Sequence, residues 1–135
     1  MATVYNNPGN IEAGQGYAGE TGQTYGRGRF AVFSSPEMGL RALAYDLRTK
    51  MNEFDGDVSK VISKYAPANE NKTKQYIDYV KGQIGGNTIT EKNLAKAVAA
   101  VVRMENSDAT EATYLGKDLN DFSMVNEASE LARLD

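Results

Sequence analysis

The distribution of glycine divides the chain into two parts that cannot adopt the same structure. Seven of the 13 glycines lie in residues 1–29, which also contain the turn-forming stretch NNPGN. Glycine, asparagine and proline favour turns and short extended segments over helix. The stretch RFAVF, at residues 29–33, has the apolar and aromatic composition of a short strand. We therefore predict that residues 1–35 form a glycine-rich loop and a small β hairpin.

Helical periodicity dominates the remainder of the chain. Apolar residues recur at i, i+3 and i+4 from residue 36 onward, and this pattern predicts five helices. Their expected ranges are 36–51, 58–66, 69–85, 91–105 and 124–134, and four of them have a predicted N-cap in Ser35, Asp57, Thr90 and Ser123. The fold class is therefore mostly α (α+β), a single domain over 1–135 with a helical core over 36–107 and an acidic helical extension over 108–135.

The composition excludes several classes of chemistry. The chain has no cysteine and no histidine, so thiolates, disulfides, imidazole bases and histidine-containing zinc sites are impossible. Any acid–base chemistry must depend on carboxylates and tyrosines. The net charge of −3 argues against a nucleic-acid partner. No apolar run approaches the length of a membrane span, and the N-terminus has no secretory signal pattern.

Two glycine-containing stretches match ligand motifs only superficially. GQGYAG, at residues 14–19, fits G-x-G-x-x-G, but neither the preceding strand nor the following helix of a dinucleotide site is predicted there. EFDGD, at residues 53–57, lacks the ligand order of a calcium loop, because the sixth position counted from Asp55 is Lys60 and not glycine. We therefore predict no cofactor and no metal.

Glu105 interrupts the apolar face of its predicted helix. It follows Leu94, Val98 and Val102 on the same helical stripe. One interpretation is that Glu105 lies beyond the helix end, and another is that it pairs with Arg103 or Lys96. The functional interpretation is that a poorly solvated carboxylic acid retains its proton and acts as a general acid, as in glycosidases.

Tyrosine is unusually frequent for a chain of this size. The eight tyrosines, together with asparagine and glutamine side chains, could line a saccharide groove, because aromatic rings stack on sugars and amides bond hydroxyls. A tyrosine in an amphipathic helix can equally be a half-buried core residue.

Four blocks in order resemble a family of tailed-bacteriophage proteins. They are YNNPGNI, RFAVFSSPEMGLRAL, SKYAPANENKTKQYIDYV and AVVRMENS, and together they extend from residue 5 to about residue 107. The family is lysozyme-like and directed at peptidoglycan. Three positions depart from its pattern: Tyr65 replaces a tryptophan, Met104 a histidine and Ser107 a glycine.

The resemblance implies a circularly permuted lysozyme-like fold. Bacterial glucosaminidases have the acidic helix first and the NNPGNI-like turn afterwards, whereas here the helix ending in MENS comes last. Permutation is physically inexpensive where the termini lie together at a domain surface. In this arrangement Glu105 takes the place of the catalytic acid, and NNPGNI packs beside it.

The expected function is therefore a phage virion-associated, peptidoglycan-degrading activity of the lytic transglycosylase or muramidase type. Glu105 is the expected general acid, and Glu37 is a candidate second carboxylate, with Glu12 and Glu20 as further candidates. A transglycosylase requires only one carboxyl group. The residues expected to bind substrate are Asn7, Asn10, Asn106, Tyr25 and Tyr76.

Two other functions remain open at this stage. The chain could be a non-catalytic tail or internal virion protein that retains the fold, or a free endolysin. The expected partners are the peptidoglycan glycan strand and other virion proteins in the tail or core. The expected location is the virion, with synthesis in the host cytoplasm and action at the host periplasm or cell wall.

Overall fold

The structure, a computed structural model, describes residues 5–66, 70–106 and 108–133. The order of elements is β1 (Glu20–Tyr25), β2 (Phe30–Phe33), α2 (Pro36–Glu53), α3 (Val58–Tyr65), α4 (Glu70–Ile84), α5 (Leu94–Glu105), α6 (Asp108–Leu115) and α7 (Ser123–Ala132). A mostly helical protein with a small N-terminal hairpin is thus confirmed. None of the helices in the described ranges combines the length and apolar composition that a bilayer crossing needs.

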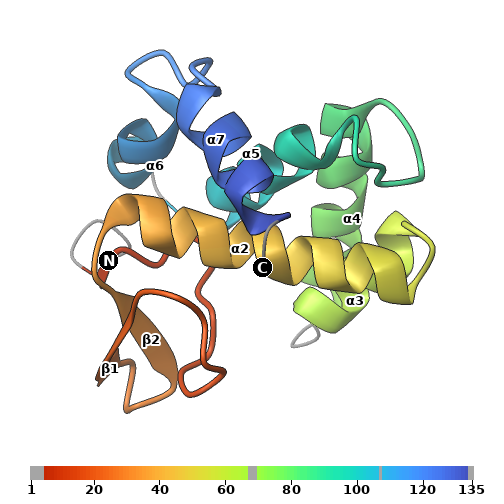
Figure 1. Cartoon of the computed structure of the whole chain (residues 1–135). Coiled ribbons are helices and arrows are strands. Elements are labelled where there is room, and N and C mark those ends of the chain that lie inside the picture. Colours follow the sequence, from red (N-terminus) through yellow and green to blue (C-terminus); the bar gives the residue numbers. More distant parts are fainter. Residues whose placement is uncertain (1–4, 67–69, 107, 134–135) are drawn as a thin grey trace.

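The hairpin forms one end of the molecule. β1 and β2 pair antiparallel with an irregular register between Glu20 and Thr24. β1 is largely exposed, whereas β2 buries Ala31 and Phe33 in the core. Figure 1 shows α2 running across the molecule, with the hairpin near its N-terminal end and α3 and α4 near its other end.

Helix α5 is the central helix of the bundle. Nearly all of its residues from Leu94 to Val102 are buried, and it packs against α2, α4, α6 and α7. A helix that is apolar all round is typical of one surrounded by others. Glu105, as its last residue, is therefore carried from the core to the surface.

The helix starts confirm two of the four predicted caps. Ser35 Oγ accepts the Met38 N–H at 3.2 Å, and Asp57 Oδ1 accepts the Lys60 N–H at 3.2 Å. The caps predicted at Thr90 and Ser123 are wrong. Asn93 precedes α5 and its side chain accepts the Thr90 N–H instead. Phe122 precedes α7, and Asp121 accepts the Ser123 N–H.

The C-terminal segment belongs to the core as well as to the surface. Helix α6, which the periodicity did not predict, buries Tyr114 and Leu115. Helix α7 packs on α2 and buries Val125 and Ala128. The acidic C-terminal segment therefore contributes to the core of the domain.

Candidate functional site

Glu105 lies where the N-terminal loop meets the end of α5. It is half-buried, and the Asn10 Nδ2 donates a hydrogen bond of 2.9 Å to Glu105 Oε1, across 95 positions of sequence. The neighbouring Asn106 Nδ2 donates to the Pro8 carbonyl at 2.8 Å and to the Val102 carbonyl at 2.7 Å. The NNPGNI loop therefore packs beside Glu105, as the order of the sequence blocks predicted.

Asn10 connects Glu105 to a tyrosine of the hairpin. Its backbone is left-handed, with φ of 51°, and its Oδ1 accepts the Tyr25 hydroxyl at 3.0 Å. Tyr25 in turn stacks on Tyr5, with ring centroids 4.0 Å apart and an angle of 7° between the rings. Asn10 is thus fixed from behind and directs a donor at the carboxylate, which orients Glu105.

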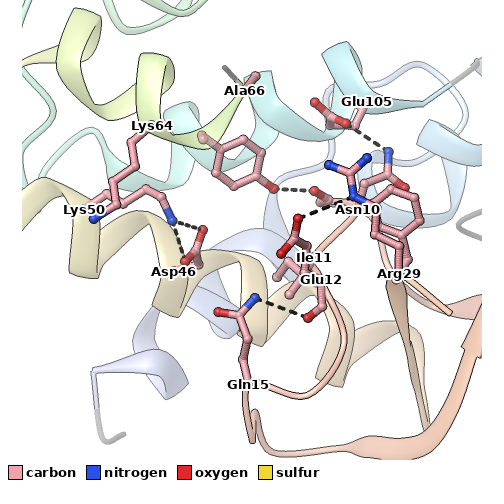
Figure 2. A pocket seen from close by; sticks show the side chains of 13 residues that line it. Asn10, Ile11, Glu12, Gln15, Arg29, Asp46, Lys50, Lys64, Ala66 and Glu105 are labelled. Atoms are coloured by element: carbon pink, nitrogen blue, oxygen red, sulfur yellow. Dashed lines mark hydrogen bonds and ion pairs between the residues drawn. The ribbon is translucent and has the colours of Figure 1, made fainter. Parts of the chain in front are cut away.

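Among the described residues, two hollows adjoin Glu105. The first, which we call the charged hollow, has a volume of about 380 Å³ and is drawn in Figure 2. The second, the Tyr76 hollow, has a volume of about 340 Å³. Glu105 and Ala66 line both, so the carboxylate lies at the junction of the two. The Tyr76 hollow is also lined by Lys72, Thr73, Gln75, Tyr76 and Met104.

Tyr76 lines the second hollow together with Glu105. Its side chain is only 5% exposed, and the hydroxyl forms no hydrogen bond of standard geometry within the described residues. Burial, followed by the charge of the nearby Glu105 and a hydrogen bond of non-standard geometry to its carboxylate, raises the pKa of Tyr76. The Tyr76 hydroxyl therefore lies close enough to the Glu105 carboxylate to interact with it.

In the described part of the chain, the structure does not contain the alternative that the sequence left open, an ion pair of Glu105 with Arg103 or Lys96. Arg103 donates to Gln83 Oε1 at 3.0 Å and to the Leu119 carbonyl, and its guanidinium lies over the Phe122 ring. Within the described ranges, neither Arg103 nor Lys96 forms an ion pair with Glu105. Glu105 is also the last residue of α5 and does not lie beyond it.

Two asparagines expected to bind substrate hold the loop in place. Asn7 is fully buried: its Nδ2 donates to the Ile11 and Ala31 carbonyls, and its Oδ1 accepts the Ile11 N–H. Asn106 uses its amide hydrogens on Pro8 and Val102. The Asn7 amide is used entirely within the loop, so the role expected from sequence is corrected to a structural one. Asn106 is only partly buried, and its role in substrate binding stays a prediction.

The three candidate second carboxylates either lie away from Glu105 or are bonded to other groups. Glu37 is exposed in the first turn of α2 and lines neither hollow. The expectation that Glu37 is a second carboxylate of the site is therefore wrong. Glu20 accepts the N–H groups of Gly14 and Tyr17. Glu12 lines the charged hollow and pairs with Arg29 at 3.4 Å.

Sequence reasoning missed most of the charged hollow. Arg29, Asp46, Lys50 and Lys64 come from three separate elements or loops and have no shared motif. Ser107, at the position of the glycine of the family pattern, lies outside the described residues. Met104, at the position of the histidine, is 38% exposed and lines the Tyr76 hollow.

The buried tyrosines predict loss of stability in alkali. Burial is the largest cause of a raised pKa for five of them, with the pKa of Tyr25 raised to about 12; the five are Tyr17, Tyr25, Tyr65, Tyr76 and Tyr114. The folded protein therefore retains these protons to higher pH than the unfolded chain. Stability is fully present below about pH 10 and falls above it, by up to about 1.4 kcal/mol per pH unit for each tyrosine.

Thermal melting followed by circular dichroism, together with tyrosinate absorbance, checks this expectation. The melting temperature should fall steeply above about pH 10, and the tyrosines should ionise with unfolding. A melting temperature that stays constant to about pH 12 while the tyrosines ionise would contradict it.

Comparison with known proteins shows that the sequence of this helical domain is similar to that of a bacteriophage protein. No protein-family model matches the sequence. Protein P5 of Pseudoalteromonas phage PM2 is 30% identical over 81 residues, which are 57% of this chain and 51% of that protein. The chain thus spans about half the length of this curated relative. The likeness supports a bacteriophage connection.

Proposed function

We propose that this chain is a phage virion-associated domain that cleaves host peptidoglycan, with a glycan strand lying across Glu105 and occupying both hollows. The observation that carries the proposal is the position of Glu105: it lines both hollows, it forms no ion pair within the described residues, and Asn10 orients it. A carboxylic acid at the junction of two subsites is placed to reach the bond between two sugars.

The chemistry assigned to Glu105 is general acid–base catalysis on a glycosidic bond. The protonated carboxyl donates its proton to the glycosidic oxygen as the bond from that oxygen to the anomeric carbon breaks. In a lytic transglycosylase, a hydroxyl of the same substrate sugar then attacks the anomeric carbon and returns its proton to the Glu105 carboxylate. The product is an anhydro sugar, and no water is consumed.

A mechanism with one carboxylate fits the surroundings better than one with two. The other carboxylates that line the charged hollow are Glu12, paired with Arg29, and Asp46, paired with Lys50 at 2.7 Å. The Asp46 carboxylate is only 14% exposed and is held by Lys50 and the Tyr17 hydroxyl, so it is not available for attack. The Glu12 carboxylate is 61% exposed and stays solvated at the rim of the hollow. This favours the transglycosylase over the muramidase form of the proposal.

The lysozyme-like fold and the circular permutation are part of the same proposal. The contacts of the NNPGNI loop with Glu105 and Asn106 support them, because the blocks meet in space in the order that permutation requires. The likeness to protein P5 of phage PM2 supports a bacteriophage setting, in which we assign the domain to the virion. In this setting the domain acts on the host cell wall during genome entry.

Incubation of the purified protein with peptidoglycan sacculi tests the function. We expect release of soluble muropeptides whose sugar ends are anhydro forms, as mass spectrometry would show. Reducing ends in place of anhydro ends would favour the muramidase form. No release from sacculi of several bacterial hosts would contradict cleavage and favour a non-catalytic virion protein.

A further inference from the structure

We propose that the charged hollow binds the stem peptide of the peptidoglycan strand, so that the protein discriminates peptide-bearing strands from bare glycan. This inference rests on the proposed function and names the part of the substrate that the hollow recognises. Its basis is the difference in chemistry between the two hollows beside Glu105.

The charged hollow has two walls that carry ionic groups. Figure 2 shows Lys50, Lys64 and Asp46, from α2 and α3, on one side, and Arg29 and Glu12, from the N-terminal segment, on the other. Apart from the lactyl carboxyl of muramic acid, to which the peptide is joined, the sugars are uncharged and are bound mainly by ring stacking and neutral hydrogen bonds. The stem peptide carries carboxylates and, at its diamino acid, an ammonium group. The carboxylates and the ammonium group of the peptide are complementary to the basic and acidic side chains that line the charged hollow.

The ionic groups at the rim are available for exchange with a ligand. The Arg29 and Glu12 side chains are 66% and 61% exposed in a pair of 3.4 Å, and Lys64 pairs with Glu53 while more than half exposed. Exposed pairs of this kind contribute about 0–1 kcal/mol, so a ligand carboxylate can replace Glu12 or Glu53 at little cost. Arg29 can form two parallel hydrogen bonds with such a carboxylate.

The floor of the hollow is by contrast fixed. The Lys50 and Asp46 side chains are only 15% and 14% exposed, and the Tyr17 hydroxyl also donates to Asp46 at 3.0 Å. A fixed floor with exchangeable rim charges can receive a charged ligand without refolding. Because Glu105 lines this hollow too, a peptide bound in it would stay attached to a sugar at the cleavage point.

The test compares peptide-bearing glycan strands with strands stripped of peptide by an amidase, which leaves one lactyl carboxylate on each muramic acid in place of the peptide. We expect the wild-type protein to cleave peptide-bearing strands at least about tenfold faster, since two charge-assisted hydrogen bonds supply this much. In the double variant Arg29→Gln/Lys64→Gln the ratio of the two rates should fall towards one. The matched control is Lys60→Gln/Lys74→Gln, which removes two exposed charges that line neither hollow and should keep the ratio.

Binding by the Glu105→Gln protein separates this inference from the proposed function. Calorimetry with a soluble disaccharide and the corresponding disaccharide–peptide should show at least about tenfold tighter binding of the peptide form, weakened by salt. Cleavage with equal rates on both strands and equal binding would overturn the inference and leave the function standing. Tighter peptide binding without any cleavage by the wild type would overturn the function and leave the inference standing.

Discussion

Replacement of Glu105 by glutamine should abolish most of the muralytic activity while leaving the fold intact. Glutamine has nearly the same shape, and its side-chain oxygen can still accept the Asn10 Nδ2 hydrogen bond. It cannot donate a proton to a glycosidic oxygen. General acid–base catalysis contributes about 10²–10⁴-fold, so the rate of muropeptide release should fall by that factor. Release from sacculi, measured at equal concentrations of folded protein, checks this result.

Glu127→Gln is the matched control for that experiment. Glu127 is exposed on α7, lines neither hollow beside Glu105, and undergoes the same loss of one negative charge. It should release muropeptides as fast as the wild type, and both variants should melt at the same temperature. If Glu105→Gln retained wild-type activity, Glu105 would have no part in the mechanism, even though the protein itself cleaved peptidoglycan.

The fold could be predicted from sequence wherever the signal is local. The predicted helix starting at Pro36 forms with Ser35 as its cap, and the predicted stop at Gly85 follows the last residue of α4. Such features depend on neighbouring residues, which sequence displays directly. Helix α6 could not be predicted, because its apolar residues show no clear periodicity and it buries the polar Thr110 and Glu111 as well as Tyr114 and Leu115.

The site could be predicted only in part, for a related reason. Glu105 was identifiable because a carboxylate interrupts an apolar stripe, which is a local anomaly. Its contact with Asn10 was expected only from the order of the family-like blocks, since the two residues are 95 positions apart. Asn7 was misassigned because sequence does not reveal burial: its amide is used entirely within the loop. The charged hollow depends on packing between elements, which no single stretch encodes.

The second large expected effect concerns a glycine of the SPEMGLRAL block. At Gly39, an added Cβ would lie 1.6 Å from the carbonyl oxygen of Asn6 and 3.0 Å from the Pro8 side chain. Neither a backbone oxygen nor a proline ring can move aside independently, so Gly39→Ala must push the NNPGNI loop away from α2. Overpacking costs about 1–3 kcal/mol and sometimes more, and we expect about 3 kcal/mol or greater here because the obstacle is backbone. Urea unfolding checks the loss.

Gly82→Ala is the control for this experiment. It shows whether the loss of stability comes from the contact between residue 39 and the NNPGNI loop or from replacing any glycine within a helix. Gly82 lies within α4, and nothing is found within 4 Å of its added Cβ, so alanine should stabilise the protein by about 0.5–1 kcal/mol. Because the displaced loop carries Asn10, surviving Gly39→Ala protein should also lose Glu105-dependent cleavage, whereas Gly82→Ala should keep it. If Gly39→Ala were as stable as Gly82→Ala, the loop would not rest on α2, and the positioning of Glu105 by that loop would lose its structural basis.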